Sequence, residues 1–283
     1  AGLLAAMASY PSAQQATRLD GLIEGTVASS NGAEAGVWVI AETEDLPTKF
    51  VKIVVTDDDG RYVVPDLPKA TYDVWVRGYG LADSAKVKIA VTPGAANPPA
   101  VALEAVVAKS PQEAAKVYPA NYWYSMLSIP GKDQFPGTGQ DGNGIASNFK
   151  SQAQYIDQLK QGCQLCHQLG NQVTREITHL SHLRFDSALE AWDHRVQVGV
   201  RGGTMNFFMN RFGRPAGLEM YADWTDRIMA GETPDAPPRP SGRERNVVVT
   251  LWDWGNDTSY IHDEITTDKW NPATVNAGGP VYG

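Results

Sequence analysis

The stretch Thr56-Asp57-Asp58-Asp59-Gly60-Arg61-Tyr62 has the composition of a tight turn, with short acidic residues followed by a glycine. β-Branched residues alternate with other residues on both sides of it, as at Ile53, Val55 and Val64. This period of two predicts strands with one buried face, and we expect the stretch to join them as a hairpin. A calcium loop of the EF-hand type needs alternating acidic ligands and a distal Glu, so we interpret the aspartates as a solvated turn tip.

The same pattern extends over residues 18–107. Turn signals separate its short β-branched runs, at Ser30-Asn31-Gly32, Pro65-Asp66-Leu67-Pro68 and Pro93-Gly94. Strands at short, regular spacing are typical of an antiparallel β-sandwich, and the β-branched residues disfavour helix. We therefore predict a sandwich domain over 18–107. Before this domain we expect a leader or signal remnant over 1–17.

Four segments of this region carry a resemblance to a known family. They are Leu22-Ile23-Glu24-Gly25-Thr26-Val27, Gly36-Val37-Trp38-Val39, the Thr56–Tyr62 stretch and Leu67-Pro68-Lys69-Ala70-Thr71-Tyr72-Asp73-Val74. Together they resemble the carboxypeptidase regulatory-like domain, a transthyretin-like sandwich of seven strands. Ala70 stands where that family usually has glycine. The resemblance implies a fold and says little about activity, because such modules are mostly structural or adhesive.

From Ser110 onward the sequence is typical of helices. Ser110-Pro111-Gln112-Glu113 is a capping signature with proline at the first helical position. Further helices are expected at Val173–Ile177, Ser187–Val198 and Ala216–Ala230. We predict a mainly helical domain over 108–245, which makes the chain an α+β protein of two domains. A C-terminal extension is expected over 246–283, and residues 245–254, at the junction, are expected to form a strand.

The motif Cys163-Gln164-Leu165-Cys166-His167 contains both cysteines of the chain. The pattern C-x-x-C-H is typical of covalent c-type haem attachment. On a helix the three side chains share one face, so the two sulfurs can form thioethers with the porphyrin vinyl groups and His167 can bind the iron. Two alternatives remain. A Cys163–Cys166 disulfide needs a βαβ context that is not visible nearby, and a zinc site needs further ligands.

The sixth iron ligand has to come from elsewhere in the chain. Met205, in Gly203-Thr204-Met205-Asn206-Phe207, lies in a sequence that looks like the methionine loop of cytochromes c, and Met209 is one helical turn further on. A histidine ligand, an open site, or simple packing of either methionine are the alternatives. Arg201 is our candidate for pairing with a haem propionate, because Gly202-Gly203 would let the backbone approach closely.

Other polar and aromatic residues of this region are weaker candidates. His179 and His182 are spaced for one helical face, but no Cys or Glu-x-x-His partner supports a metal site there. An Asp193–His194 pair cannot be distinguished from a solvated helix face on sequence. Three further arginines could form ion pairs with haem propionates: Arg175, Arg184 and Arg195. Trp192 and Trp224 are expected to pack at the haem edge or in the helical core.

Composition restricts the partners of the chain. Its 283 residues carry 24 Lys and Arg against 32 Asp and Glu, a net charge of −8. A net negative charge argues against nucleic acid or an anionic membrane surface as a binding partner, because both would repel the protein. No apolar run reaches the length of a membrane span. Resemblance to c-type cytochromes implies export, since haem c is attached outside the bacterial cytoplasm, so we expect a periplasmic or secreted protein.

The C-x-x-C-H segment resembles a class I cytochrome c domain enlarged by loops. With the sandwich before it and residues 246–283 after it, the chain resembles secreted bacterial proteins in which a propeller related to streptogramin lyases follows. Two hypotheses result: an electron-transfer protein with one covalent haem and a redox partner, or the accessory part of a propeller lyase or dehydrogenase. A weaker one is carbohydrate binding by Trp38, Trp75 and Tyr79. No catalytic triad, phosphate loop or paired carboxylates stand out.

Overall fold

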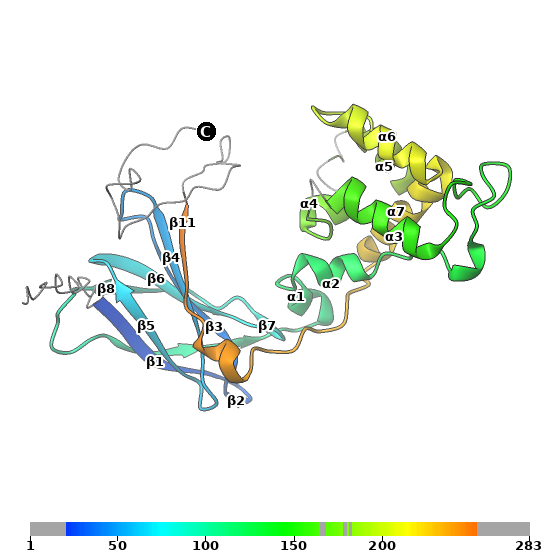
Figure 1. The fold of residues 1–283 in the computed structure, drawn as a ribbon. Coiled ribbons are helices and arrows are strands. Elements are labelled where there is room, and N and C mark those ends of the chain that lie inside the picture. Colours follow the sequence, from blue (N-terminus) through cyan, green and yellow to red (C-terminus); the bar gives the residue numbers. More distant parts are fainter. Residues whose placement is uncertain (1–20, 165–167, 178–179, 181–182, 254–283) are drawn as a thin grey trace, which may run out of the picture. The chain divides into compact units, whose positions relative to one another are not determined.

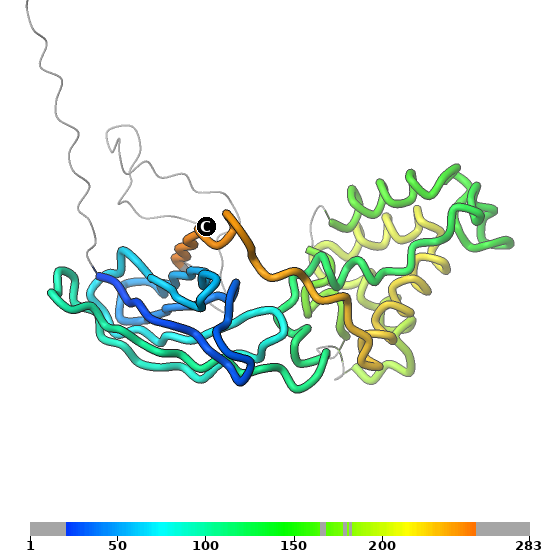
Figure 2. Tube along the Cα trace, turned by 90° about the horizontal axis from the view of Figure 1, so that it is seen from below, coloured from blue at the N-terminus to red at the C-terminus, as the bar shows by residue number. Residues whose placement is uncertain are grey.

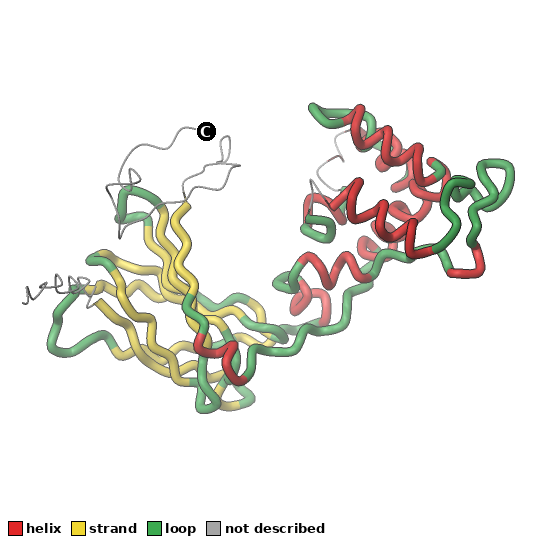
Figure 3. Tube along the Cα trace, viewed as in Figure 1, coloured by secondary structure: helices red, strands yellow, loops and turns green. Residues whose placement is uncertain are grey.

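A computed structural model describes residues 21–164, 168–177, 180 and 183–253. The chain divides into two compact units. The first contains the strands of both large sheets and comprises Ala1–Gly78, Asp83–Val106 and Arg239–Gly283. The second comprises Tyr79–Ala82 and Val107–Pro238 and holds the α-helices. Figure 3 shows this separation of strands from helices along the chain.

The first unit is built from two sheets (Figure 1). One has the order β2-β1-β5, with β9 pairing β1 in parallel, and its strands are β1 (Gly21–Ser29), β2 (Gly32–Ala33), β5 (Arg61–Leu67) and β9 (Ala100–Glu104). The other has the antiparallel order β11-β4-β3-β6-β8, from β3 (Trp38–Thr43), β4 (Lys49–Val55), β6 (Ala70–Arg77), β8 (Val87–Val91) and β11 (Val249–Asp253). The expected β-sandwich is confirmed.

The buried faces of the sheets follow the period of two that the sequence shows. In β4, Phe50 and Val54 are buried while Val51 and Ile53 are only partly covered. Phe50 meets Tyr72 of β6 edge to face, with ring centroids 6.2 Å apart. In β4 the alternation therefore places one face in the core and leaves the other partly exposed, whereas β3 and β6 each contain three consecutive buried residues.

The hairpin expected at Thr56–Tyr62 is not formed. β4 pairs with β3 and β11, whereas β5 pairs with β1 in the other sheet, so the turn carries the chain from one sheet to the other. The turn itself is as expected. The Asp57 carboxylate accepts hydrogen bonds from the backbone N–H groups of Asp59 and Arg61, and Gly60 has a φ of 75°. Alternation alone does not distinguish a hairpin from a corner between sheets, because both present the same buried faces.

The strand expected near the C-terminal end is present but shorter. Gly242–Asn246 forms a 3-10 helix, and β11 begins at Val249 and pairs antiparallel with β4. The return to the first unit starts at Arg239, before the boundary at residue 245 that composition suggested. The 3-10 helix and β11, orange in Figure 2, lie against the N-terminal strands. The described part of the expected extension is thus a strand of the sandwich.

The second unit is a cluster of mostly short helices. The Ser110 hydroxyl accepts a hydrogen bond from the Glu113 N–H, as the capping signature predicted. The helices are α1 (Pro111–Ala115), α2 (Ala120–Ser125), α3 (Gln152–Leu159), α4 (Gln172–Arg175), α5 (Ala188–Arg195), α6 (Gly202–Phe212) and α7 (Arg214–Met229). The fully buried Tyr155, Phe212, Tyr221 and Trp224 form the centre of their core. Across the described ranges, no helix has the length and hydropathy needed to cross a bilayer.

Candidate functional site

A cavity in the second unit brings together several of the residues singled out above. The empty space in the cavity and at its mouth is about 690 Å³, and most of the side chains around it are apolar or aromatic. Its wall is formed by Gly162, Cys163, Leu169, Thr174, Trp192, Arg195, Val196, Arg201, Thr204, Met205, Phe208, Met209 and Tyr221. A concave apolar site with a few polar groups is the usual form of a ligand or cofactor site.

Cys163 reaches this cavity from a π-helical turn, Lys160–Gln164, which continues α3. Gly162 allows the turn to come close to α6, because a Cβ atom at Gly162 would lie 2.8 Å from the Phe208 ring. Cys163 is partly buried in this position. The other two residues of the motif, Cys166 and His167, lie outside the described residues.

Helix α6 contributes Arg201, Met205 and Met209 to the same cavity. Arg201 precedes the first helical residue, and its carbonyl oxygen accepts a hydrogen bond from the Met205 N–H at 2.9 Å. Met209 is 3% exposed, and a Cβ atom at Gly217 of α7 would lie 2.6 Å from its sulfur. Met205 is less buried. The Met209 thioether is therefore packed against the neighbouring helix, whereas the Met205 side chain has more freedom.

The partly buried Tyr124 and the buried Tyr155 and Tyr221 lie near Cys163. Burial, and secondarily the nearby Cys163, raise the pKa of Tyr124 to about 12 and raise the pKa of Tyr155 further. The pKa of Tyr221, which lines the cavity, is also well above its ordinary value because of burial and of Cys163. Its ring stacks on Trp192 with a centroid distance of 4.8 Å. All three phenols are therefore neutral at physiological pH, and Tyr221 is the one of the three that lines the cavity.

The arginines expected near a haem have different surroundings. Arg195 lies over the Trp192 ring at 4.9 Å, and its guanidinium donates to the carbonyl oxygens of Val173 and Thr174. Desolvation lowers the pKa of Arg195, which lines the cavity with the exposed Arg201. Arg175 instead stacks over Trp123 at 4.0 Å and donates to the Gly170 carbonyl oxygen at 2.8 Å. It therefore stabilises the fold around α4.

The remaining candidates do not converge on the cavity. The Asp193 carboxylate accepts two hydrogen bonds from Arg214, and the His194 ring lies 5.1 Å from the Phe185 ring, so the two side chains have different partners. His179 and His182 lie outside the described residues. Within the described ranges, no group of three or more His, Cys, Asp and Glu side chains is arranged to hold a metal ion.

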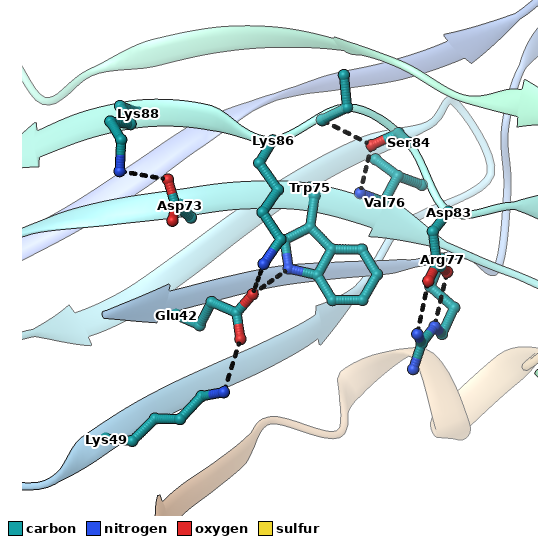
Figure 4. Close-up of polar contacts among 11 residues, drawn as sticks. Glu42, Lys49, Asp73, Trp75, Val76, Arg77, Asp83, Ser84, Lys86 and Lys88 are labelled. Atoms are coloured by element: carbon teal, nitrogen blue, oxygen red, sulfur yellow. Dashed lines mark hydrogen bonds and ion pairs between the residues drawn. The ribbon is translucent and has the colours of Figure 1, made fainter. Parts of the chain in front are cut away.

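The outer face of the five-stranded sheet carries a polar network around Glu42 (Figure 4). Its carboxylate accepts hydrogen bonds from Lys86 at 2.5 Å and from the Trp75 indole N–H at 3.0 Å, and Lys49 lies 3.6 Å away. Burial by itself would raise the pKa of Glu42, but the hydrogen bond and charge of Lys86, with Trp75 and Lys49, outweigh it and hold the pKa below its ordinary value.

This network also bears on the aromatic residues considered for carbohydrate binding. Arg77 and Lys86 cover the Trp75 ring at 4.8 Å and 5.7 Å from its centroid, and Trp75 is 8% exposed. Tyr79 packs edge to face on Tyr118, with centroids 5.6 Å apart. Trp38 is half-buried. Trp75 and Tyr79 are thus engaged with protein side chains and form no open platform for a sugar ring.

Tyr221, which lines the cavity, and Tyr155, whose pKa is affected by the nearby Cys163, were not predicted from the sequence to lie here. Tyr155 precedes the C-x-x-C-H motif on α3, and Tyr221 follows it on α7. No local sequence motif connects these two tyrosines with Cys163. Tyr221 reaches the cavity because α7 packs against α5 and α6, and such packing is not encoded by nearby residues. The sequence predicted a helix over Ala216–Ala230, but not which of its side chains would come close to Cys163.

Comparisons with known proteins give information on the first unit. No curated protein matches the chain. Nine chains of solved structures match, among them one from a type II cohesin–X-dockerin complex of Acetivibrio cellulolyticus. It is 18% identical over 29% of this chain and 51% of that chain, with a TM-score of 0.21. The carboxypeptidase regulatory-like domain family matches residues 22–104. The residues that carried the resemblance lie within that range, and residues 22–104 form a carboxypeptidase regulatory-like domain.

Proposed function

We propose that this protein is an extracytoplasmic c-type haem protein that transfers electrons through one covalently attached haem. The observation that carries the proposal is the cavity of the second unit. Cys163, from the C-x-x-C-H motif, lines it together with Met205 of α6 and Arg201, the residue just before that helix. They offer a thioether-forming thiol, a soft iron ligand and a partner for carboxylates, and each of these groups can serve a haem c.

The residues present fit such a group. Cys163 and Cys166 would hold it by thioethers, His167 would be the proximal ligand, and the haem would supply one-electron redox chemistry when bound. Aromatic and aliphatic side chains of the cavity would exclude water and so tune the potential. Met205 is the better axial candidate, because packing at Gly217 restrains Met209. Arg201, which is exposed at the cavity wall, is available for a propionate.

The sandwich would serve as a docking or spacer module. The chain leaves it after β9 and returns to it at Arg239, so both ends of the helical unit are attached to the same domain. A net charge of −8 favours a partner with a basic surface. The partner would be a redox protein or a propeller domain that follows this segment, in the periplasm or outside the cell.

Expression with export and haem-attachment machinery tests the proposal. The purified protein should give a pyridine haemochrome spectrum with one haem per chain, acid-acetone should not extract the chromophore, and the mass should exceed that of the polypeptide by one haem. The double variant Cys163→Ser, Cys166→Ser is the matched control and should carry no covalent haem. Absence of haem from correctly exported protein, or its complete extraction by acid-acetone, would contradict the proposal.

A further inference from the structure

The outer face of the five-stranded sheet is apolar over much of its width, although it points away from the core of the sandwich. The strand register places one set of side chains on this face across β11, β4, β3 and β6. The apolar members of this set form the outer apolar face: Val249, Leu251, Val51, Ile53, Val55, Trp38, Ile40 and Trp75. Ile40 and Trp75 are buried, but Val249 and Leu251 are 37% and 49% exposed, and the three β4 side chains are partly exposed.

The other sheet of the sandwich provides a comparison within the molecule. The exposed side chains on its outer face are mostly charged, polar or small: Glu24, Thr26, Arg61, Val63, Ala100, Ala102 and Glu104. Sheets that face water on one side usually alternate apolar residues inside with polar residues outside. The outer apolar face departs from this rule, and a contiguous apolar patch of this kind marks an interaction surface.

Charged side chains border the outer apolar face on the side of β6 and β8. Glu42 contacts Lys86 at 2.5 Å, and Asp73 contacts Lys88 at 3.0 Å (Figure 4). An apolar centre with a polar rim is the usual arrangement of a protein interface. Since these rim charges are paired with one another, apolar contact rather than charge has to select what covers the face.

The size of the outer apolar face decides between a second copy of the chain and a tethered occupant. Four strands about 4.8 Å apart, each with about six residues of about 3.4 Å, cover about 400 Å². Two such faces pressed together would bury about 800 Å², which is below the roughly 1,200 Å² at which stable protein interfaces begin. A segment of the same chain needs less area, because a short tether gives it an effective concentration in the millimolar range.

The chain that follows β11 is tethered in this way. β11 pairs only with β4 among the described residues, so it is the edge strand, and it ends at Asp253 beside the outer apolar face. Residues 254–283 lie outside the described residues. Their sequence contains a turn-like Gly255-Asn256-Asp257 and then the apolar residues Tyr260, Ile261, Ile265 and Trp270. Residues 258–270 can span about 40 Å when extended, twice the width of the face.

We propose that residues 258–270 pack their apolar side chains on the outer apolar face and complete the sandwich on that side. The contact removes the exposed surface of Val249 and Leu251 from water, together with that of the covering side chains, and this burial is its driving force. Because the occupant belongs to the same chain, the contact does not depend on protein concentration.

Photocrosslinking in the full chain tests the contact. Val51 lies on the outer apolar face and is far in sequence from residues 258–270. It is replaced by the photoreactive residue p-benzoylphenylalanine, and mass spectrometry of the digested protein locates the crosslinks. We expect crosslinks within one chain to residues 258–270. Val63, an exposed valine on the outer face of the other sheet, is the matched position and should give none to that segment.

Crosslinks from Val51 to a second chain would show that another copy covers the face, and the proposal would then be wrong. It would also be wrong if Val51 gave no crosslink to residues 258–270, or if Val63 reached that segment equally well.

Two double variants test the same contact without an artificial residue. Ile261→Asp with Ile265→Asp removes apolar side chains, whereas Thr266→Asp with Thr267→Asp adds the same charge to the same segment. The first pair should raise the fluorescence of the apolar dye anilinonaphthalene sulfonate by about 2- to 5-fold and speed up amide hydrogen exchange in β11. The second pair should leave both near their wild-type values. Equal responses of the two pairs, or none from the first, would overturn the proposal.

Discussion

The guanidinium of Arg239 donates a hydrogen bond to the Glu34 carboxylate at 2.5 Å, joining two residues 205 positions apart in the chain. Glu34 is buried, and the Ser29 hydroxyl donates to the other oxygen of its carboxylate. The same guanidinium donates to the Ala35 carbonyl oxygen at 3.3 Å, and Gly36 lies close to the Pro240 carbonyl group. The segment that follows the helical unit is thus attached at a defined point of the sandwich.

Arg239→Gln should destabilise the sandwich by about 1–3 kcal/mol, because it leaves a buried carboxylate without its cationic partner. Glu34→Gln should cost less, since it leaves no buried charge. Urea unfolding followed by tryptophan fluorescence measures both. Arg245→Gln is the control. Its partner Asp58 is exposed, so we expect a change below about 0.5 kcal/mol. A larger effect from Arg245→Gln than from Arg239→Gln would contradict the assignment.

The strand β11 should be required for full stability of the sandwich. Trp252 packs on the buried Phe50 with ring centroids 4.8 Å apart, and Val249–Asp253 pairs with β4 along its length. A chain ending at Pro238 should melt at a lower temperature than one ending at Asp253, and Trp252→Ala should cost about 1–2 kcal/mol. Calorimetry of the two truncated chains measures the difference. Equal melting temperatures would show that residues 21–106 form a complete domain.

Axial ligation should depend on Met205 rather than on Met209. In haem-loaded protein, Met205→His should remove the weak sulfur-to-iron charge-transfer band at the red edge of the visible spectrum and lower the potential, because methionine ligation raises it. Met209→Leu, a change of similar volume, should keep the band and cost less than about 1.5 kcal/mol. Loss of the band in Met209→Leu alone would reverse the assignment.

Glu42 should give the sandwich a stability that depends on acid pH. Its folded-state pKa is below its ordinary value, so the ionised carboxylate stabilises the fold above the unfolded-state pKa of about 4.3. That contribution is lost as the pH falls through the folded-state value. Denaturant unfolding between pH 3 and 6 should show a smaller slope of stability against pH in Glu42→Gln than in the wild-type chain. An identical slope would show that the Lys86 contact adds nothing in solution.

Local features of the fold could be predicted because they depend on neighbouring residues. The Ser110 cap needs only a hydroxyl three residues before an N–H group, and alternation in β4 defines its buried face. The helices α5 and α7 lie close to their expected ranges. The prediction of a hairpin at Thr56–Tyr62 was wrong. β4 and β5 pair with other strands, in two different sheets, and those partners are distant in sequence.

For the candidate site, the sequence by itself determined the chemistry: a C-x-x-C-H motif, two methionines one helical turn apart and an arginine before them. Tertiary structure decided which of these side chains share a cavity, and it added Tyr221, which the packing of α7 brings beside Cys163. It also decided that β11 belongs to the sandwich. The physical reason is that spacing along a helix or strand follows from covalent geometry, whereas contacts between distant segments follow from the burial of many side chains at once.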